Sequence, residues 1–138
     1  VTTASDCTWV LTQSWLNKTE VGKYHHRHNH SNSLISGVVY LETDVTDTIT
    51  FFREERNLLS LTVENYHLFN SPSWKFSVKS GDILLFPSHL HHMVEEKIDG
   101  VERISLAFNV WVRGTIGVAK DMTELEIESD FRHLRKNY

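Results

Sequence analysis

Histidine is the residue type in this chain whose number and spacing most directly suggest chemistry. Seven of the nine histidines fall in two short segments, residues 25–30 and 89–92, each next to a strand-like apolar run. Imidazole is a common ligand for first-row transition metals, and two histidines at positions i and i+2 of a strand point to the same side, so both can reach one ion. The pattern predicts a metal site assembled from two distant segments.

The spacing around each cluster selects particular histidines. The first cluster reads Gly22, five residues, His28, one residue, His30, and the second reads Gly81, five residues, Pro87, four residues, His92. These spacings resemble the two sequence motifs of the cupins, and the resemblance implies that His28, His30 and His92 bind one metal ion. The glutamate that cupins usually place three or four residues after the first pair is missing, because Leu34 and Ile35 occupy those positions.

Other histidines of the two clusters stay open as ligands. A shift of two residues would make His26 and His28 the first pair, and a shift of one would replace His92 by His91. His25 and His89 are equally ambiguous on spacing alone. The structural alternative is that any single histidine is an ordinary surface or hydrogen-bonded residue.

A strand with one polar face follows the second cluster. Along residues 103–112 the alternation places Arg103, Ser105, Ala107 and Asn109 on one face and apolar residues on the other. A guanidinium can bind a carboxylate through two parallel hydrogen bonds, and a hydroxyl two positions further on can add another. We therefore expect this face to bind a carboxylate-bearing ligand, with pairing between Arg103 and an acid such as Glu102 as the alternative.

Four segments together resemble a family of small oxygenases of bacteria and phages that depend on Fe(II) and 2-oxoglutarate. The segments are residues 28–33, 36–41, 85–88 and 103–109, and the resemblance spans residues 15–125. It implies Fe(II) as the metal, 2-oxoglutarate and O2 as cosubstrates, and contacts from Arg103 and Ser105 to the far carboxylate of 2-oxoglutarate. Tyr40 stands where prolyl-hydroxylase-like relatives carry a tyrosine that contacts the cosubstrate, and we also assign Asn109 to this group.

The second position of the first metal pair departs from that family. Such oxygenases usually bind iron with two histidines and one carboxylate, whereas this chain has His30 where the aspartate or glutamate would stand. A site of three neutral histidines would hold one more positive charge than the usual site. This difference is expected to change the redox chemistry and the binding of the 2-oxo acid.

The elements that position these residues are predicted to be short strands. Period-two apolar patterns mark strands at residues 34–41, 48–52, 59–63, 74–78, 83–86 and 103–112. Turn residues separate them at 44–47, 70–72, 80–82 and 99–100, and one short charged helix is conceivable at 128–136. The prediction is an all-β double-stranded β-helix, a cupin-like jelly roll with little helix, forming one domain over residues 1–138.

Composition narrows the possible partners. The net charge of −4 and the lack of a basic run argue against nucleic acid as a partner, and no apolar stretch reaches membrane-spanning length. A single cysteine, Cys7, cannot form an internal disulfide, so we expect a cytoplasmic protein. The chain begins at Val1 rather than at a methionine, which leaves open whether it is a processed or trimmed piece of a longer protein.

Three other functions keep the metal site but not the cosubstrate. One is a cupin-type three-histidine dioxygenase or isomerase that uses no 2-oxo acid, another is zinc-dependent hydrolysis, and a third is a non-catalytic jelly-roll module with a structural metal. Neither the substrate nor the oligomeric state follows from the sequence. We expect loops at 42–48, 53–57 and 64–73 to select the substrate.

Overall fold

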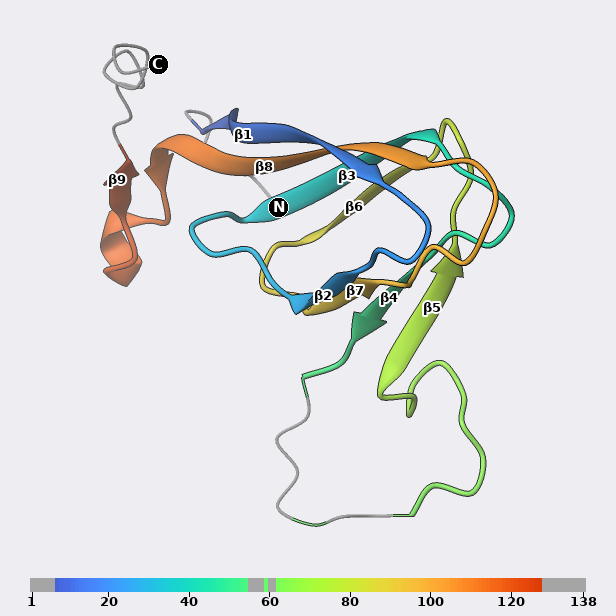
Figure 1. Ribbon diagram of the computed structural model, residues 1–138. Helices are drawn as coiled ribbons and strands as arrows, with labels where there is room; N and C mark the ends of the chain where they lie inside the picture. The colour runs from blue at the N-terminus through green and yellow to red at the C-terminus, as the bar shows by residue number, and fades with distance from the viewer. Residues whose placement is uncertain (1–6, 55–58, 60–61, 128–138) are drawn as a thin grey trace.

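The computed structural model describes residues 7–54, 59 and 62–127, which form two antiparallel β-sheets. The larger sheet has the strand order β1-β8-β3-β6, with β9 paired to β8, and the smaller has the order β2-β7-β4-β5. Figure 1 shows the two sheets as facing layers. The strands of the larger sheet are β1 (Thr8–Thr19), β3 (Ile35–Glu42), β6 (Ile83–Pro87), β8 (Arg103–Ile116) and β9 (Leu125–Ile127). Those of the smaller sheet are β2 (His25–His28), β4 (Thr48–Phe52), β5 (Ser73–Ser77) and β7 (His92–Val94).

This arrangement confirms the predicted jelly roll with little helix. In the part of the chain that the structure describes, helix is limited to one short 3-10 turn, η1 (Ala119–Asp121). The conceivable helix at 128–136 lies outside the described residues. No described helix is long and apolar enough to cross a membrane.

The hydrophobic core lies between the two sheets. Its buried members come from strands of both layers and from the residue that follows β5, and they are Tyr40, Ile49, Phe51, Val78, Phe86 and Val94. Phe51 and Phe86 meet edge to face with ring centroids 5.0 Å apart, and both rings also lie against His92. The histidine region is therefore built directly onto the core, where close packing fixes side-chain positions.

The predicted strand at residues 59–63 is wrong for the residues that the structure describes there. Leu59, Thr62 and Val63 belong to no strand, and Leu59 is exposed. Strand β4 already pairs with β7 on one side and β5 on the other, so this apolar segment has no free strand edge beside β4. Residues 62–72 instead project away from the two layers (Figure 1).

The alternation predicted for residues 103–112 is confirmed from Arg103 to Asn109 and ends before Val112, which is buried although it was expected on the outer face. Arg103, Ser105, Ala107 and Asn109 are all buried, whereas the residues between them are partly or fully exposed. β8 sits between β1 and β3, and this central position holds its inner face against the smaller sheet. The polar inner wall expected from the sequence thus faces the interior.

Candidate metal centre

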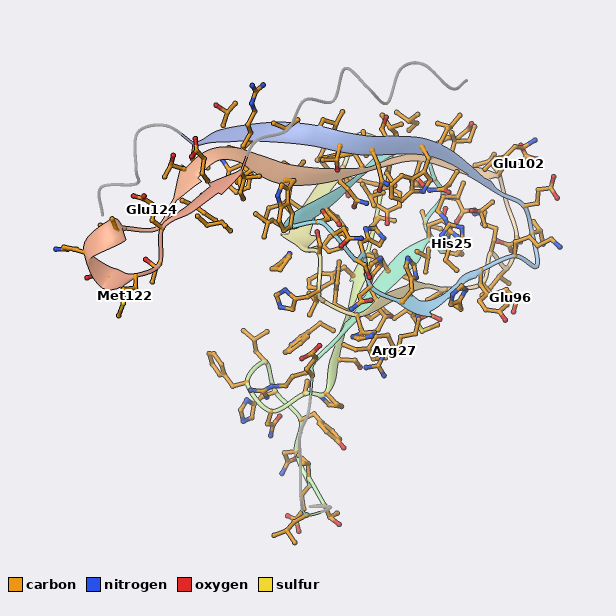
Figure 2. All side chains as sticks on the ribbon, turned by 90° about the vertical axis from the view of Figure 1, so that its left-hand side faces the viewer. His25, Arg27, Glu96, Glu102, Met122 and Glu124 are labelled. Atoms are coloured by element: carbon orange, nitrogen blue, oxygen red, sulfur yellow. The ribbon has the colours of Figure 1, made fainter. Side chains whose placement is uncertain are left out.

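His28 and His92 face each other on paired strands. They are directly opposite in the antiparallel pair of β2 and β7, and their ring centroids are 4.4 Å apart. The register of this pair shifts between His25 and His28, so both of these histidines turn inward although they are three residues apart. Figure 2 shows His25 between the layers, while Arg27 on the same strand points away from them.

His30 joins this pair from the segment that follows β2. Its backbone N–H donates to the carbonyl of Ser88 at 2.9 Å, which attaches this segment to the chain after β6. The His30 ring lies 5.3 Å from that of His28 and 5.1 Å from that of His92, measured between centroids. One nitrogen from each of His28, His30 and His92 lies within 4.8 Å of the others, a separation that suits ligands of one metal ion.

The convergence of His28, His30 and His92 distinguishes them from the other histidines that the sequence spacing left open as ligands. Among residues 7–54, 59 and 62–127, this is the one group of three or more potential ligand side chains whose donor atoms converge in this way. His26 and His91 do not belong to it. The His91 ring instead lies 3.9 Å from a carboxylate oxygen of Glu54.

Hydrogen bonds to the Nδ1 atoms orient all three rings. Nδ1 of His28 lies 2.7 Å from the carbonyl oxygen of His26, and Nδ1 of His92 lies 3.0 Å from that of Leu90. A carbonyl oxygen only accepts, so Nδ1–H is the donor and Nε2 keeps its lone pair. Histidine ligands in metal sites are commonly held in this way.

The third ring is held by side chains rather than by a carbonyl group. Nδ1 of His30 lies 2.8 Å from Oδ1 of Asn109 and 2.7 Å from Oγ of Ser36. The amide of Asn109 donates to Oε1 of Gln13 at 3.0 Å, so its oxygen faces His30. Ser36 donates to the same oxygen and is itself linked to Ser88, which makes the support of His30 a buried polar network.

Burial disfavours the protonated form of two of these histidines, His30 and His92. Desolvation lowers the pKa of His92 to about 4, and it also lowers the pKa of His30 despite the hydrogen bond to Asn109. An unprotonated imidazole is the form that binds a metal, so at neutral pH protons scarcely compete for His92. Three imidazole nitrogens that converge in this way are a donor set that fits a divalent transition metal.

The three histidines line a cavity between the sheets together with polar residues of β3 and β8. Tyr40, Arg103 and Ser105 line the same cavity, and Tyr40 and Ser105 are directly opposite each other in the pairing of β3 with β8. All three are buried. Residues predicted to bind the metal and residues predicted to bind a carboxylate therefore meet in one cavity.

Two of these polar groups lack a partner. The Tyr40 hydroxyl and Nη2 of Arg103 are buried and have no hydrogen-bond acceptor among the described residues. Desolvation raises the pKa of Tyr40 to about 12, so the hydroxyl remains a neutral donor. A buried donor without a partner is costly, and two of them in one cavity indicate a ligand with acceptor oxygens.

Arg103 has a different acidic partner from the one considered in the sequence. Its Nη1 donates to Oδ1 of Asp47 at 2.8 Å, whereas Glu102 pairs with Lys18. Asp47 lies in the turn before β4, and only its place in a turn was evident from the sequence. Nη2 of Arg103 has no partner among the described residues, and Arg103 lines the cavity.

Asn109 and His25 are placed in ways that the sequence did not indicate. Asn109 contacts His30 and does not line the cavity, so its assignment to the cosubstrate stays a prediction. His25 does line the cavity, and burial, followed by the nearby positive charge of Arg103, lowers its pKa. The bulge in β2 that turns His25 inward leaves no signal in a histidine-rich segment.

The chain matches a known protein family. A family model described as "Putative 2OG-Fe(II) oxygenase" matches residues 13–109, which is most of the chain. The chain therefore belongs to this family, whose description names Fe(II) as the metal and 2-oxoglutarate as the cosubstrate. No curated protein matches the chain.

Two solved structures are similar to this chain in fold. One is an oxidoreductase of the 2OG-Fe(II) oxygenase family from Burkholderia pseudomallei, with 14% identity, a TM-score of 0.57 and coverage of 75% of this chain and 45% of that one. Another is the non-heme monooxygenase ThoJ in a nickel complex, with 13% identity, a TM-score of 0.54 and coverage of 94% and 60%. The chain thus spans about half the length of these proteins, and at such identities the likeness establishes the fold.

Proposed function

We propose that this chain is an Fe(II)- and 2-oxoglutarate-dependent oxygenase that hydroxylates its substrate, with residues 1–138 forming one jelly-roll domain. In this proposal His28, His30 and His92 hold the metal. Arg103, Tyr40 and Ser105 hold the 2-oxo acid. Membership of the oxygenase family supports the class of reaction, and the cavity supports the division of roles.

The observation that carries the proposal is the pair of buried donors without partners beside the histidine cluster. These donors are Nη2 of Arg103 and the hydroxyl of Tyr40, and both residues line the same cavity as the three histidines. A hydrolytic zinc site, a cupin-type site without a 2-oxo acid, or a structural metal would leave these donors without a role. A 2-oxo acid with a second carboxylate accepts both hydrogen bonds while its other end reaches the metal.

Each protein group then has a separate task. The Nδ1 hydrogen bonds hold the three imidazoles with Nε2 toward the ion, Arg103 supplies the charge that binds the far carboxylate, and Tyr40 adds a neutral hydrogen bond. Bound Fe(II) supplies the oxidising chemistry that converts 2-oxoglutarate, O2 and a substrate C–H bond to succinate, CO2 and a C–OH group. The enclosing sheets limit the access of water to this chemistry.

Succinate formation tests this function. Protein loaded with Fe(II) should convert 2-oxoglutarate to succinate and CO2 in the presence of O2, slowly alone and faster with a true substrate. Arg103→Ala should lower the affinity for 2-oxoglutarate about 100-fold, because a buried charge-assisted hydrogen bond contributes about 2–5 kcal/mol to binding, while the iron content stays unchanged. Unchanged 2-oxoglutarate binding in this variant would remove Arg103 from the proposed site.

A further inference from the structure

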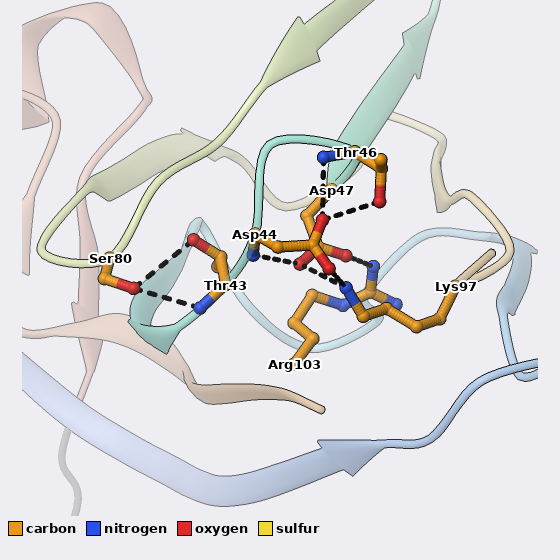
Figure 3. A network of polar contacts seen from close by, with 7 residues as sticks. All are labelled: Thr43, Asp44, Thr46, Asp47, Ser80, Lys97 and Arg103. Atoms are coloured by element: carbon orange, nitrogen blue, oxygen red, sulfur yellow. Dashed lines mark hydrogen bonds and ion pairs between the residues drawn. The ribbon is translucent and has the colours of Figure 1, made fainter. Parts of the chain in front are cut away.

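A buried network of charges lies directly behind Arg103. Oδ1 of Asp47 accepts from Nη1 of Arg103 at 2.8 Å, and Oδ2 of Asp47 accepts from Nζ of Lys97 at 3.2 Å. Lys97 also pairs with Asp44. Figure 3 shows the carboxylate of Asp47 between the two cations. Arg103, Asp47 and Lys97 are each no more than 2% exposed.

Stability alone is a weak reason for such a network. Burying the three charged groups of Asp47, Lys97 and Arg103 carries a large desolvation penalty, and buried ion pairs often contribute little net stability compared with apolar residues of the same size. The charges of Asp44, Asp47, Lys97 and Arg103 cancel, so the network adds no net charge to attract an anion. What it does leave is one buried donor without a partner, Nη2 of Arg103, on a residue that lines the cavity.

The acidic side of the network is held rigidly. The backbone N–H of Asp44 donates to Oδ2 of Asp47 at 3.0 Å, and the side chain of Asp44 is itself fixed by the backbone N–H and hydroxyl of Thr46. The carbonyl of Asp47 accepts from the backbone N–H of Val78 at 3.1 Å, which attaches the turn to the end of β5. Asp47 therefore offers Arg103 a fixed acceptor rather than a mobile surface carboxylate.

The cationic side is anchored as well. The backbone N–H of Lys97 donates to the carbonyl of Lys23 at 2.9 Å, so the residue is tied to the segment that leads into β2. Gly100 packs against the Asp44 carboxylate so closely that a Cβ there would clash with it. The network thus joins the turn before β4, the segment after β7 and the start of β8 at one end of the cavity.

We propose that Asp47 and Lys97 are positioning residues that orient the Arg103 guanidinium and so determine selectivity for 2-oxo acids with a second carboxylate. This inference rests on the proposed role of Arg103 in binding 2-oxoglutarate. Asp47 engages Nη1 and directs Nη2 to the cavity. Lys97 balances the second oxygen of Asp47, which keeps that carboxylate from turning away from Arg103.

If Asp47 acted only through its charge, its removal would change the affinity for 2-oxoglutarate in the opposite direction. Removing a negative charge next to Arg103 would strengthen the attraction of an anionic ligand if orientation did not matter. If orientation does matter, the freed guanidinium loses its fixed geometry and binds the carboxylate less well, because small displacements of a binding group are costly. The direction of the change in affinity therefore separates the two roles.

Anaerobic titration of the Fe(II)-loaded protein tests the proposal, with 2-oxoglutarate and pyruvate as probes. Pyruvate has the 2-oxo acid group but no second carboxylate, so its binding does not require a contact with Arg103. Asp47→Ala should raise the Kd for 2-oxoglutarate about 10-fold or more and change the Kd for pyruvate and for Fe(II) by less than about two-fold. Lys97→Met should act in the same direction and more weakly.

The controls keep the test specific. Lys18→Met breaks the exposed Lys18–Glu102 pair beside Arg103 and should leave all three affinities unchanged. Adding Asp47→Ala to Arg103→Ala should weaken 2-oxoglutarate binding no further, because Asp47 acts through Arg103. If Asp47→Ala does not fold, Asp47→Asn and Lys97→Met are judged by the same criteria.

The outcomes also separate this inference from the proposed function. Unchanged 2-oxoglutarate binding in Arg103→Ala would refute the function assigned to Arg103. A loss in Arg103→Ala combined with unchanged or tighter binding in Asp47→Ala would refute the positioning role alone. Equal weakening of 2-oxoglutarate and pyruvate in Asp47→Ala would identify a general structural defect and would likewise overturn the proposal.

Discussion

Substitution of Asn109 can decide whether its side chain supports the metal ligand His30 or binds the cosubstrate, because the two roles predict opposite results. Its side-chain oxygen lies 2.8 Å from Nδ1 of His30 and 2.7 Å from Oγ of Ser36, and its amide donates to Gln13. Asn109→Ala removes all three hydrogen bonds at a position that is 4% exposed. His30 then keeps only Ser36 as an Nδ1 partner, and its ring is free to turn.

The expected loss is larger for metal binding than for folding. Residues that orient a histidine ligand contribute about 10–100-fold to metal affinity, so Asn109→Ala should weaken Fe(II) binding by a factor in that range. The free energy of unfolding of the metal-free protein should fall by about 1–3 kcal/mol, since Ser36 loses a buried acceptor. Anaerobic Fe(II) titration and chemical denaturation measure the two quantities separately.

A matched variant makes the prediction specific. Asn109→Asp keeps an oxygen that accepts from Nδ1 of His30 and places a carboxylate behind the ligand, which increases the basicity of the imidazole. Iron affinity in Asn109→Asp should therefore stay above that of Asn109→Ala. If Asn109 contacts the cosubstrate instead, Asn109→Ala will keep normal Fe(II) affinity and lose 2-oxoglutarate affinity, and that result would refute the reasoning.

Three further predictions address the ligands and the fold. His30→Asp, which restores a carboxylate, should retain Fe(II) and 2-oxoglutarate binding while His30→Ala weakens iron binding, and normal iron affinity in His30→Ala would exclude His30 as a ligand. Because the folded-state pKa of His92 is about 4 against 6.5 when unfolded, the unfolded state takes up more protons between these values. The metal-free protein should thus lose up to about 3 kcal/mol of stability from this group as pH falls from 7 to 4, with a smaller slope in His92→Gln. Gly37→Ala should lower the unfolding free energy by about 1–3 kcal/mol, because a Cβ there would clash with the ring of Phe108, and an unchanged thermal midpoint would contradict this packing.

The sequence was most informative where local spacing and periodicity decide the structure. The cupin-like spacing of Gly22, Gly81 and Pro87 predicted His28, His30 and His92 from among seven clustered histidines, and the structure brings these three side chains together. The inner face of β8 followed from simple alternation, since a central strand has one side against the core. Both features depend on neighbours within a few residues.

The features that the sequence did not reveal depend on contacts between distant segments. β1 has mostly exposed side chains and no clear apolar period, and its main support is pairing with β8 over nearly its whole length. The partnership of Asp47 and Lys97 with Arg103 joins three segments that nothing in the local pattern connects. The apolar run at 59–63 resembled a strand, but β4 had no edge left for it.

The most direct test of the account is the visible absorption of the anaerobic Fe(II) protein on addition of 2-oxoglutarate. A 2-oxo acid that chelates Fe(II) through its carboxylate and keto oxygens gives a metal-to-ligand charge-transfer band. We predict that this band appears in the wild type, saturates with one equivalent of iron, and requires a much higher 2-oxoglutarate concentration in Arg103→Ala. A protein that binds Fe(II) but develops no such band at any 2-oxoglutarate concentration would contradict the central claim and favour a three-histidine site that uses no 2-oxo acid.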